Sequence, residues 1–266
     1  VQACTFQNLS FDAMYLVGSR HIVEDCTFTA IGGWDVIHFG GADHIVRDNT
    51  FKDSPYIAYS PSADVWENLS AVNYSNILFT GNFVSNFAGV IAVQKGSATS
   101  TGLQIKNNIF VDVGLIALTH PNTSIQNNTF VRVSRNQSAV VARSDRAIYV
   151  NEASAATGVT AQNNVFYDCG ESASANQTLV GWYEVVGSSS FTALKNFASG
   201  ITPGLAAKVG WPDPTPALNG GDPGFVNIAS PLGTDGIAFT ADDGLRLATG
   251  SKLIGAGVSG ADIGAY

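Results

Sequence analysis

The chain has 266 residues, of which 45% are hydrophobic and 13% are charged, and its formal net charge is −8. This length is enough to bury a substantial core in one or two domains, and the acidic balance makes nucleic acid and anionic membranes poor partners. No run of about 18 apolar residues is present, so the sequence predicts no membrane span. The 28 glycines and many Asn, Ser and Thr residues favour strands and tight turns, which predicts an all-β protein.

A short repeat that ends in phenylalanine runs along most of the chain. The clearest copies are RHIVEDCTF at 20–28 and DHIVRDNTF at 43–51, in which Glu24 and Arg47 exchange charge, as do Arg20 and Asp43. Other copies end at Phe6, Phe110, Phe130 and Phe166, with degenerate copies at Phe83 and Phe197. The shortest spacings, 20 to 23 residues, indicate a stacked unit that carries insertions in some copies.

Alternating apolar and polar residues predict three short strands in each unit. The first precedes the phenylalanine, the second contains it, and the third is expected at 15–18, 37–40, 57–60, 91–94, 116–119 and 148–151. On this third strand the predicted inward positions are Tyr15, Ile37, Ile57, Ile91, Ile116 and Ile148, followed two residues later by Val17, Phe39, Tyr59, Val93, Leu118 and Val150. The predicted outward column is Leu16, His38, Ala58, Ala92, Ala117 and Tyr149.

The residues two positions before the phenylalanine are Cys4, Cys26, Asn49, Asn108, Asn128 and Asn164. This pattern resembles the right-handed parallel β-helix superfamily, which includes pectate and alginate lyases and in which asparagines of neighbouring coils stack. The resemblance covers residues 1–200 and implies a right-handed parallel β-helix of about eight three-strand turns. Residues 201–266, which end in ADIGAY, resemble the C-terminal closing segment of secreted bacterial β-helix proteins. We therefore expect a capping segment on the same solenoid, and an extracellular or cell-surface location.

The start of the chain falls inside a repeat, so we expect the N-terminal cap to be missing and further repeats or self-association at that end. The three cysteines do not make a disulfide framework. Cys4 and Cys26 share a column, which leaves both reduced thiols and a disulfide open. Cys169 is predicted to be a buried thiol. His21 and His44 also share a column, and a strand-edge pair explains them better than a metal site, because no further ligands follow.

In the enzymes that the fold resembles, substrate usually lies along the outer face of one parallel sheet. Here we expect that sheet to be the one formed by the third strands of successive coils. The insertion before Tyr149 is rich in arginine, and guanidinium groups suit the carboxylates of a uronic acid polymer. β-Elimination of such a polymer also requires a base and an acid. The predicted catalytic residues are His120, Tyr149, Lys95 and Arg146, and the predicted substrate-binding residues are Arg143, Arg132, Arg135, His38 and Glu152.

Two other interpretations stay open at this point. The arginines also fit solvated loop charges, and the whole chain fits a non-catalytic adhesin or fibre module in which the solenoid supplies length. Glycoside hydrolysis is less well supported, because the NTD, GHG and RIK motifs of the polygalacturonase branch are absent and the DD pair at 242–243 lies in the expected capping segment, far from the third strand in sequence. Calcium is the one cofactor that the sequence suggests, at Asp235, Asp242 and Asp243, although solvated turn carboxylates explain the same residues.

Overall fold

The fold is described from a computed structural model of the chain. The structure describes residues 1–32, 35–54, 64–68, 75–87, 91–92, 101–114, 116–118, 121–133, 146–150, 157–169, 181–185, 191–200 and 220–266. Among these residues, no helix is long and apolar enough to cross a membrane.

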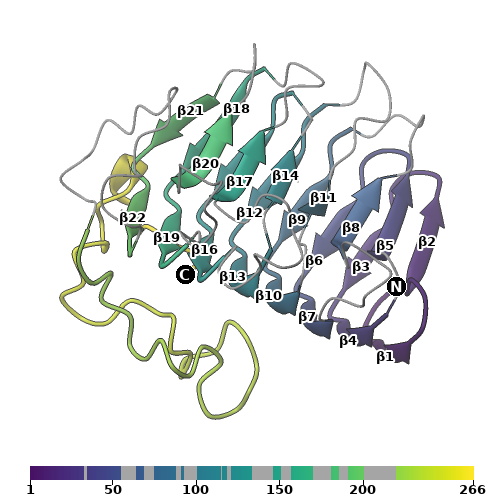
Figure 1. Ribbon diagram of the computed structural model, residues 1–266, viewed down its shortest axis with the longest axis horizontal. Coiled ribbons are helices and arrows are strands. Elements are labelled where there is room, and N and C mark those ends of the chain that lie inside the picture. Colours follow the sequence, from purple (N-terminus) through teal and green to yellow (C-terminus); the bar gives the residue numbers. More distant parts are fainter. Residues whose placement is uncertain are drawn as a thin grey trace, which may run out of the picture.

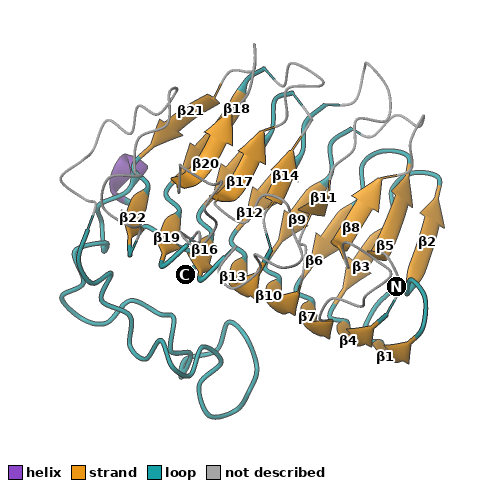
Figure 2. Ribbon diagram, in the orientation of Figure 1, coloured by secondary structure: helices purple, strands orange, loops and turns teal. Residues whose placement is uncertain are grey.

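Three parallel sheets form the body of the protein (Figures 1 and 2). Sheet A contains β3 (Ile22–Glu24), β6 (Ile45–Arg47), β9 (Leu78–Thr80), β12 (Gln104–Lys106), β15 (Ser124–Gln126), β18 (Val159–Gln162) and β21 (Phe191–Leu194). Sheet B contains β1 (Thr5–Leu9), β4 (Thr27–Ile31), β7 (Thr50–Ser54), β10 (Phe83–Phe87), β13 (Ile109–Val113), β16 (Thr129–Val131), β19 (Val165–Tyr167) and β22 (Phe197–Ser199). Sheet C contains β2 (Met14–Val17), β5 (Asp35–Gly40), β8 (Asp64–Asn68), β11 (Ile91–Ala92), β14 (Ile116–Leu118), β17 (Arg146–Val150) and β20 (Gly181–Val185).

Each strand pairs with the strand three positions later in the chain, so three successive strands make one coil. Neighbouring coils are in register, as in the pairing of Ile22–Glu24 with Ile45–Arg47. The predicted three-strand solenoid is therefore confirmed. Figure 1 shows the coils following one another along the long axis, from β1–β3 at one end to β20–β22 at the other.

The chain turns at residues that have a positive φ angle, and these recur at three places in the coil. One column lies between sheets A and B, a second near the end of each sheet B strand, and a third just before sheet A. Asn, Asp and Gly dominate because they reach this left-handed conformation at the lowest steric cost. The columns are Ala3, Asp25, Asp48, Gly81, Asn107, Asn127, Asn163 and Lys195; Asn8, Ala30, Asp53, Asn86, Asp112, Arg132, Asp168 and Gly200; and Arg20, Asp43, Asn76, Gly102, Asn122 and Gly158.

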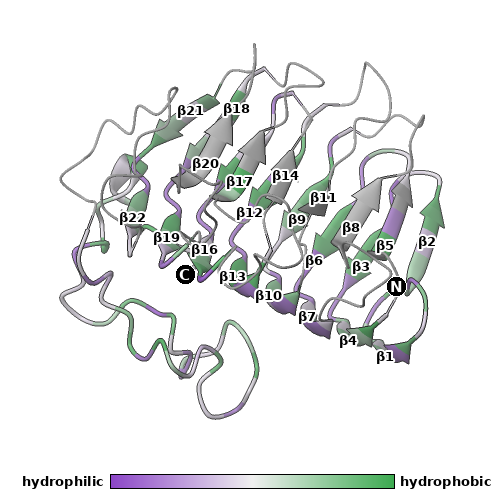
Figure 3. Cartoon of the chain, in the orientation of Figure 1, coloured by the Kyte–Doolittle hydropathy of each residue, from purple (hydrophilic) through white to green (hydrophobic). Residues whose placement is uncertain are grey.

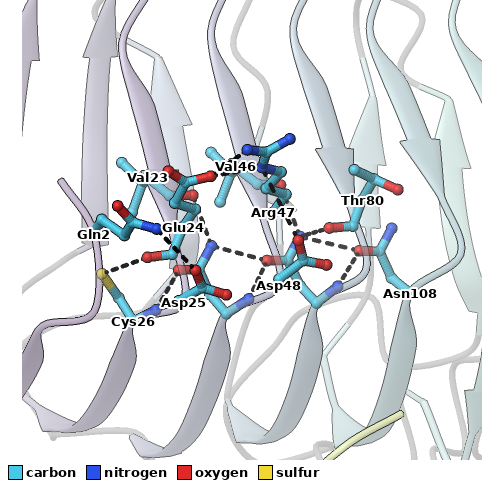
Figure 4. Close-up of polar contacts among 12 residues, drawn as sticks. Gln2, Val23, Glu24, Asp25, Cys26, Val46, Arg47, Asp48, Thr80 and Asn108 are labelled. Atoms are coloured by element: carbon cyan, nitrogen blue, oxygen red, sulfur yellow. Dashed lines mark hydrogen bonds and ion pairs between the residues drawn. The ribbon is translucent and has the colours of Figure 1, made fainter.

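A buried ladder of asparagines follows the corner between sheets A and B (Figure 4). In each step the backbone N–H and the side-chain amide of one asparagine donate to the Oδ1 of the next, as from Asn49 to Asn82 at 3.0 Å. The amide also donates to a backbone carbonyl, which for Asn49 is Val23 at 3.0 Å. These bonds satisfy buried polar groups that would otherwise destabilise the interior. The ladder consists of Asn49, Asn82, Asn108, Asn128, Asn164 and Asn196.

Asparagine, rather than phenylalanine, fixes the register of the degenerate repeats. Phe83 pairs with Thr50, and Phe197 pairs with Val165, so neither belongs to the phenylalanine column. The alignment of these two copies on their phenylalanines was wrong by one residue. The ladder bonds explain the correction, because Asn82 and Asn196 each keep the stacked position immediately before the strand.

The charge exchange between the two clearest repeats forms one cross-coil ion pair. Arg47 donates from Nε to Glu24 Oε2 at 2.7 Å, and its Nη2 also contacts that oxygen (Figure 4). Arg20 and Asp43, both described, form no ion pair with each other; Asp43 instead accepts from Asn76 Nδ2 at 3.1 Å. The pair at Glu24 therefore supports the repeat register at an exposed position, where such pairs contribute little stability.

Stacked phenylalanines fill the interior of the solenoid. Phe6, Phe28 and Phe51 stack with centroids 5.1 and 4.8 Å apart, and a second stack has spacings of 4.9 and 4.7 Å through Phe110, Phe130 and Phe166. Each buried aromatic side chain contributes about 1.5–3 kcal/mol. Figure 3 shows hydrophobic and hydrophilic colours together along the strands, as expected for strands that have one buried face.

The C-terminal segment, residues 220–266, packs against the outer face of sheet B. Two hydrogen bonds join the ends of this segment to sheet B. Gly220 N donates to Ala198 O at 2.9 Å, and Ala265 N donates to Thr129 Oγ1 at 3.0 Å. The segment contains a single 3-10 turn, η3 (Val258–Gly260). Its apolar side chains cover outward residues of sheet B that include Phe83, Ile109, Val111, Val131, Val165 and Phe197. The segment therefore lies along the side of the coil stack (Figure 1).

A change of residue type in the sequence marks where the covered part of sheet B begins. The first outward position of each sheet B strand follows the ladder asparagine, or the cysteine that replaces it in the first two coils. This position is Thr5, Thr27 and Thr50 in β1, β4 and β7, whereas most later strands have a bulky apolar residue there. This change in polarity was not recognised as a packing signal. It marks where the C-terminal segment excludes water from sheet B.

Two predictions about sheet C are corrected. Tyr15 and Val17 were expected to face inward, but they are 61% and 68% exposed, while Met14 is buried. Tyr15 pairs with His38 and Met14 with Ile37, so the predicted register was wrong by one residue. The expected strand at 57–60 lies outside the described residues, and the sheet is continued by β8, whose Trp66 pairs with Ile37.

Candidate functional site

The structure covers only part of the predicted site. Lys95, His120, Arg135, Arg143 and Glu152 lie outside the described residues. Arg146 and Tyr149 both belong to β17, in sheet C, and Tyr149 pairs with Ala117 as the predicted column requires. The convergence of the predicted catalytic residues on one cleft therefore stays a prediction.

The strand pairing defines one column of residues that crosses sheet C from coil to coil. We call it the sheet C column. Its members alternate along each strand with inward residues such as Ile37 and Ile148, which are fully buried. Aromatic and ionisable residues occupy both ends, and two alanines lie between them. In spatial order the column is Tyr15, His38, Glu67, Ala92, Ala117, Tyr149 and Glu184.

At the start of this column, three polar or aromatic side chains come together. His38 Nδ1 lies 3.1 Å from Asp12 Oδ2, and the ring of Tyr15 meets the imidazole edge-on with centroids 5.2 Å apart. The tyrosine ring is mostly exposed, while His38 is only partly so. A carboxylate that contacts Nδ1 fixes the orientation of the imidazole. The group thus offers an aromatic face beside an oriented imidazole.

Local structure explains why these side chains meet. Asp12 belongs to the connection between β1 and β2, and the next residue, Ala13, donates its N–H to Val36 O at 3.1 Å. This bond holds the connection against β5, which places Asp12 within reach of His38. Of the three residues, only His38 was predicted. Tyr15 was missed because of the one-residue register error, and Asp12 because it lies outside the repeated positions.

Arg132 lies in a different part of the coil from β17. It follows β16 directly, in sheet B, at one of the positive φ positions. Its guanidinium makes two parallel bonds to Asp112, from Nε to Oδ1 and from Nη2 to Oδ2, both 2.6 Å long. These hydrogen bonds raise the pKa of Arg132 further. The side chain therefore already has a carboxylate partner within the protein.

The three aspartates predicted to bind calcium do come together. One oxygen from each of Asp235, Asp242 and Asp243 lies within 4.8 Å of the others. Asp242 Oδ2 accepts from Thr234 N at 2.6 Å and from Thr234 Oγ1 at 2.7 Å, and the Thr234 hydroxyl is the main reason that the pKa of Asp242 is held well below its usual range.

Asp243 is fully buried, and its Oδ2 accepts from Thr240 N at 3.0 Å and from the Tyr266 hydroxyl at 2.5 Å. Burial, followed by this bond to Asp243, raises the pKa of Tyr266. The carboxylates are hard oxygen ligands, but donors from the chain already occupy several of their lone pairs. They join the C-terminal segment internally, and calcium binding stays a prediction.

The two stacked histidines form a structural pair. Their rings are 5.3 Å apart and nearly parallel, and His21 N donates to His44 Nδ1 at 3.2 Å. Burial, with a smaller contribution from the charge of His21, lowers the pKa of His44 to about 4. The predicted stacking of the two histidines in one column is confirmed. Cys169 is fully buried, as predicted.

Comparison with known proteins gives a family but no named relative. A family model described as a right handed beta helix region matches residues 1–177, which is two thirds of the 266 residues. No curated protein matches the chain. The matched residues include the asparagine ladder as far as Asn164 and the sheet C column as far as Tyr149. Three parallel sheets, in-register coils and this match agree: the chain belongs to the right-handed parallel β-helix family.

Proposed function

We propose that this protein binds an extracellular polysaccharide along the sheet C column, at a cell surface or in secreted form. The observation that carries the proposal is the register of the column, which aligns Tyr15, His38, Glu67, Ala92, Ala117, Tyr149 and Glu184 on successive strands. A polymer that lies along the solenoid axis would meet each of these positions in turn.

The residue types in the column suit sugars. A pyranose ring presents C–H groups that stack on an aromatic face, and hydroxyls that bond to carboxylate and imidazole groups. Tyr15 supplies an exposed ring and His38 an oriented imidazole. Ala92 and Ala117, which pair with each other, carry only a methyl group. The positions from Glu67 to Tyr149 span three strand spacings, or about 14 Å.

Cleavage of an acidic polymer by β-elimination is the finer form of the proposal. Two of the residues predicted for this reaction, Arg146 and Tyr149, belong to β17, a strand of the sheet that carries the column. A guanidinium would neutralise a uronate carboxylate, and a tyrosine hydroxyl would exchange a proton with the sugar. Lys95 and His120 remain the other predicted acid–base residues, and Arg143, Arg135 and Glu152 the other predicted binding residues, whereas Arg132 follows a strand of sheet B and is paired with Asp112.

Binding is tested by titrating the protein with alginate, pectate, a glycosaminoglycan and a neutral glucan, using calorimetry. Tyr15→Ala should weaken the affinity for the bound polymer about tenfold, which corresponds to the loss of one aromatic contact. Phe11→Ala is the matched control, because Phe11 is an 81% exposed aromatic outside the column. Equal losses in both variants, or no binding to any polymer, would contradict the proposal and favour a structural module.

Cleavage is measured separately, by the absorbance of unsaturated uronate in the same mixtures. Release of this product by the wild-type protein would support β-elimination. Binding without product would limit the function to recognition.

A further inference from the structure

The first two coils carry a pair of thiols where the later coils carry the asparagine ladder. Cys26 N donates to Asn49 Oδ1 at 2.9 Å, so Cys26 occupies the ladder position next to Asn49. In the following step Cys4 N donates to Cys26 Sγ at 3.4 Å, with the sulfur taking the place of an amide oxygen. The sulfur of Cys26 is therefore directed toward the coil that contains Cys4.

The backbones of the two residues are held at the spacing of neighbouring strands. Thr27 N donates to Cys4 O at 2.9 Å, and the next residues, Thr5 and Thr27, are paired in register. Neighbouring strands lie about 4.7–4.9 Å apart, which is inside the range of about 4.4–6.8 Å that disulfides require between Cα atoms. The two thiols form no disulfide in this structure, and each donates to a carbonyl of its own coil, Gln2 O and Glu24 O.

The two thiols differ in accessibility. Cys4 is partly exposed, whereas only 1% of Cys26 is exposed. Burial is the main cause that raises the pKa of Cys26. Because the thiolate is the reactive form, an external reagent should react first with Cys4. Cys169 is fully buried, and its thiol donates to the carbonyls of Phe130 and Tyr167 at 3.5 Å, so it provides an internal reference.

We propose that Cys4 and Cys26 are a redox site, which forms a disulfide between the first two coils when a small disulfide oxidant reacts with Cys4. The Cys4 thiolate attacks one sulfur of the oxidant, which forms a mixed disulfide and releases one thiolate. Cys26 then loses its proton and attacks the Cys4 sulfur, which forms the Cys4–Cys26 bond and releases the second thiolate. Two protein thiols are oxidised, and one oxidant disulfide is reduced to two thiols.

This chemistry cross-links neighbouring coils at the point where the asparagine ladder ends. A bond between Cys4 and Cys26 restricts the unfolded chain, and this is the main route by which disulfides stabilise proteins. The oxidised protein should therefore unfold at a higher temperature than the reduced protein. The proposal does not depend on the polysaccharide site, which belongs to sheet C.

The test uses the full chain and oxidised glutathione as the oxidant, followed by intact mass and by thiol titration in denaturant. The wild-type protein should lose two hydrogens and keep one titratable thiol, and Cys169→Ser should lose two hydrogens and keep none. Cys26→Ser should retain one glutathionyl group on Cys4, because the second thiol is missing. Cys4→Ser should remain unmodified. It provides the second test if Cys26→Ser does not fold.

Three results would overturn the proposal. The first is a wild-type protein that keeps three thiols after equilibration, and the second is one that keeps glutathione on Cys4 without resolving it. The third is a disulfide-linked dimer in place of the intramolecular bond. In each case the two sulfurs would not be placed for reaction with each other.

Discussion

Phe79 and Val84 lie on neighbouring strands of one coil, and their sizes are reversed relative to the adjacent coils. Phe79 lies where those coils have a smaller side chain, and Val84 lies where they have a larger one. Phe79 pairs with Val46 and Ile105 in sheet A, whereas Val84 pairs with Phe51 and Phe110 in sheet B. The ring of Phe79 nevertheless continues the aromatic stack, at 6.1 Å from Phe51 and 6.4 Å from Phe110. The coil therefore keeps its interior volume although both positions differ from the repeat.

Exchanging the two residues tests this compensation. Phe79→Val should leave a cavity and lower the free energy of unfolding by about 2–4 kcal/mol. Val84→Phe should overpack the same layer and cost about 1–3 kcal/mol. The double variant keeps the total volume, so it should lie within about 1.5 kcal/mol of the wild type in chemical denaturation. Additive losses in the double variant would show that the two positions are independent.

The asparagine ladder predicts different effects for two neighbouring asparagines. Asn108 is buried; its amide donates to Phe79 O at 2.9 Å and to Asn128 Oδ1 at 3.0 Å. Asn108→Asp replaces both donors with a carboxylate oxygen, so we expect a loss of about 3 kcal/mol, measured by urea unfolding at neutral pH. Asn107→Asp is the control, because Asn107 is exposed at a corner where other coils have aspartate. Similar losses in the two variants would contradict a stabilising ladder.

The buried histidine predicts how stability depends on pH. His44 has an ordinary pKa of 6.5 and a folded-state pKa of about 4, so the unfolded chain binds more protons between these values. Its contribution is complete above about pH 6.5 and falls as the pH drops toward 4, by up to about 3 kcal/mol. Denaturant midpoints across this window should therefore fall less steeply for His44→Asn. Equal slopes in the two proteins would mean that other groups determine the acid sensitivity.

The attachment of the C-terminal segment is tested by two adjacent residues. Leu253 is fully buried against sheet B, whereas its neighbour Ile254 is 48% exposed. Leu253→Asp places an unpaired carboxylate in that contact, and should free the segment at a cost of about 3 kcal/mol or more. Ile254→Asp should change stability by no more than about 0.5 kcal/mol. Hydrogen exchange should show lost protection in residues 220–266 for the first variant only.

The fold was predictable because its signals repeat. Alternating apolar residues around Val23, Val46 and Ile105 appear in many copies, so single exceptions do not hide the pattern. The site was harder to predict because each of its residues occurs once. Nothing in the repeat indicates that Asp12 reaches His38, since that contact depends on how one connection crosses β5. The register of Tyr15 was also missed, because an alignment of Gly18 with Gly40 shifts this strand by one residue from the observed pairing of Val17 with Gly40.

The two ends of sheet B differ in what covers their outer face. The C-terminal segment covers β10 and the later strands of sheet B, while β1, β4 and β7 present threonines on their outer face. The described residues of β1, β4 and β7 belong to neither of the two apolar clusters that the C-terminal segment forms with sheet B. Adding or removing a coil of this kind would change the length of the protein without uncovering the apolar surface beneath the segment. The C-terminal segment thus fixes the number of coils that it covers, whereas the number of coils before β10 is free to vary.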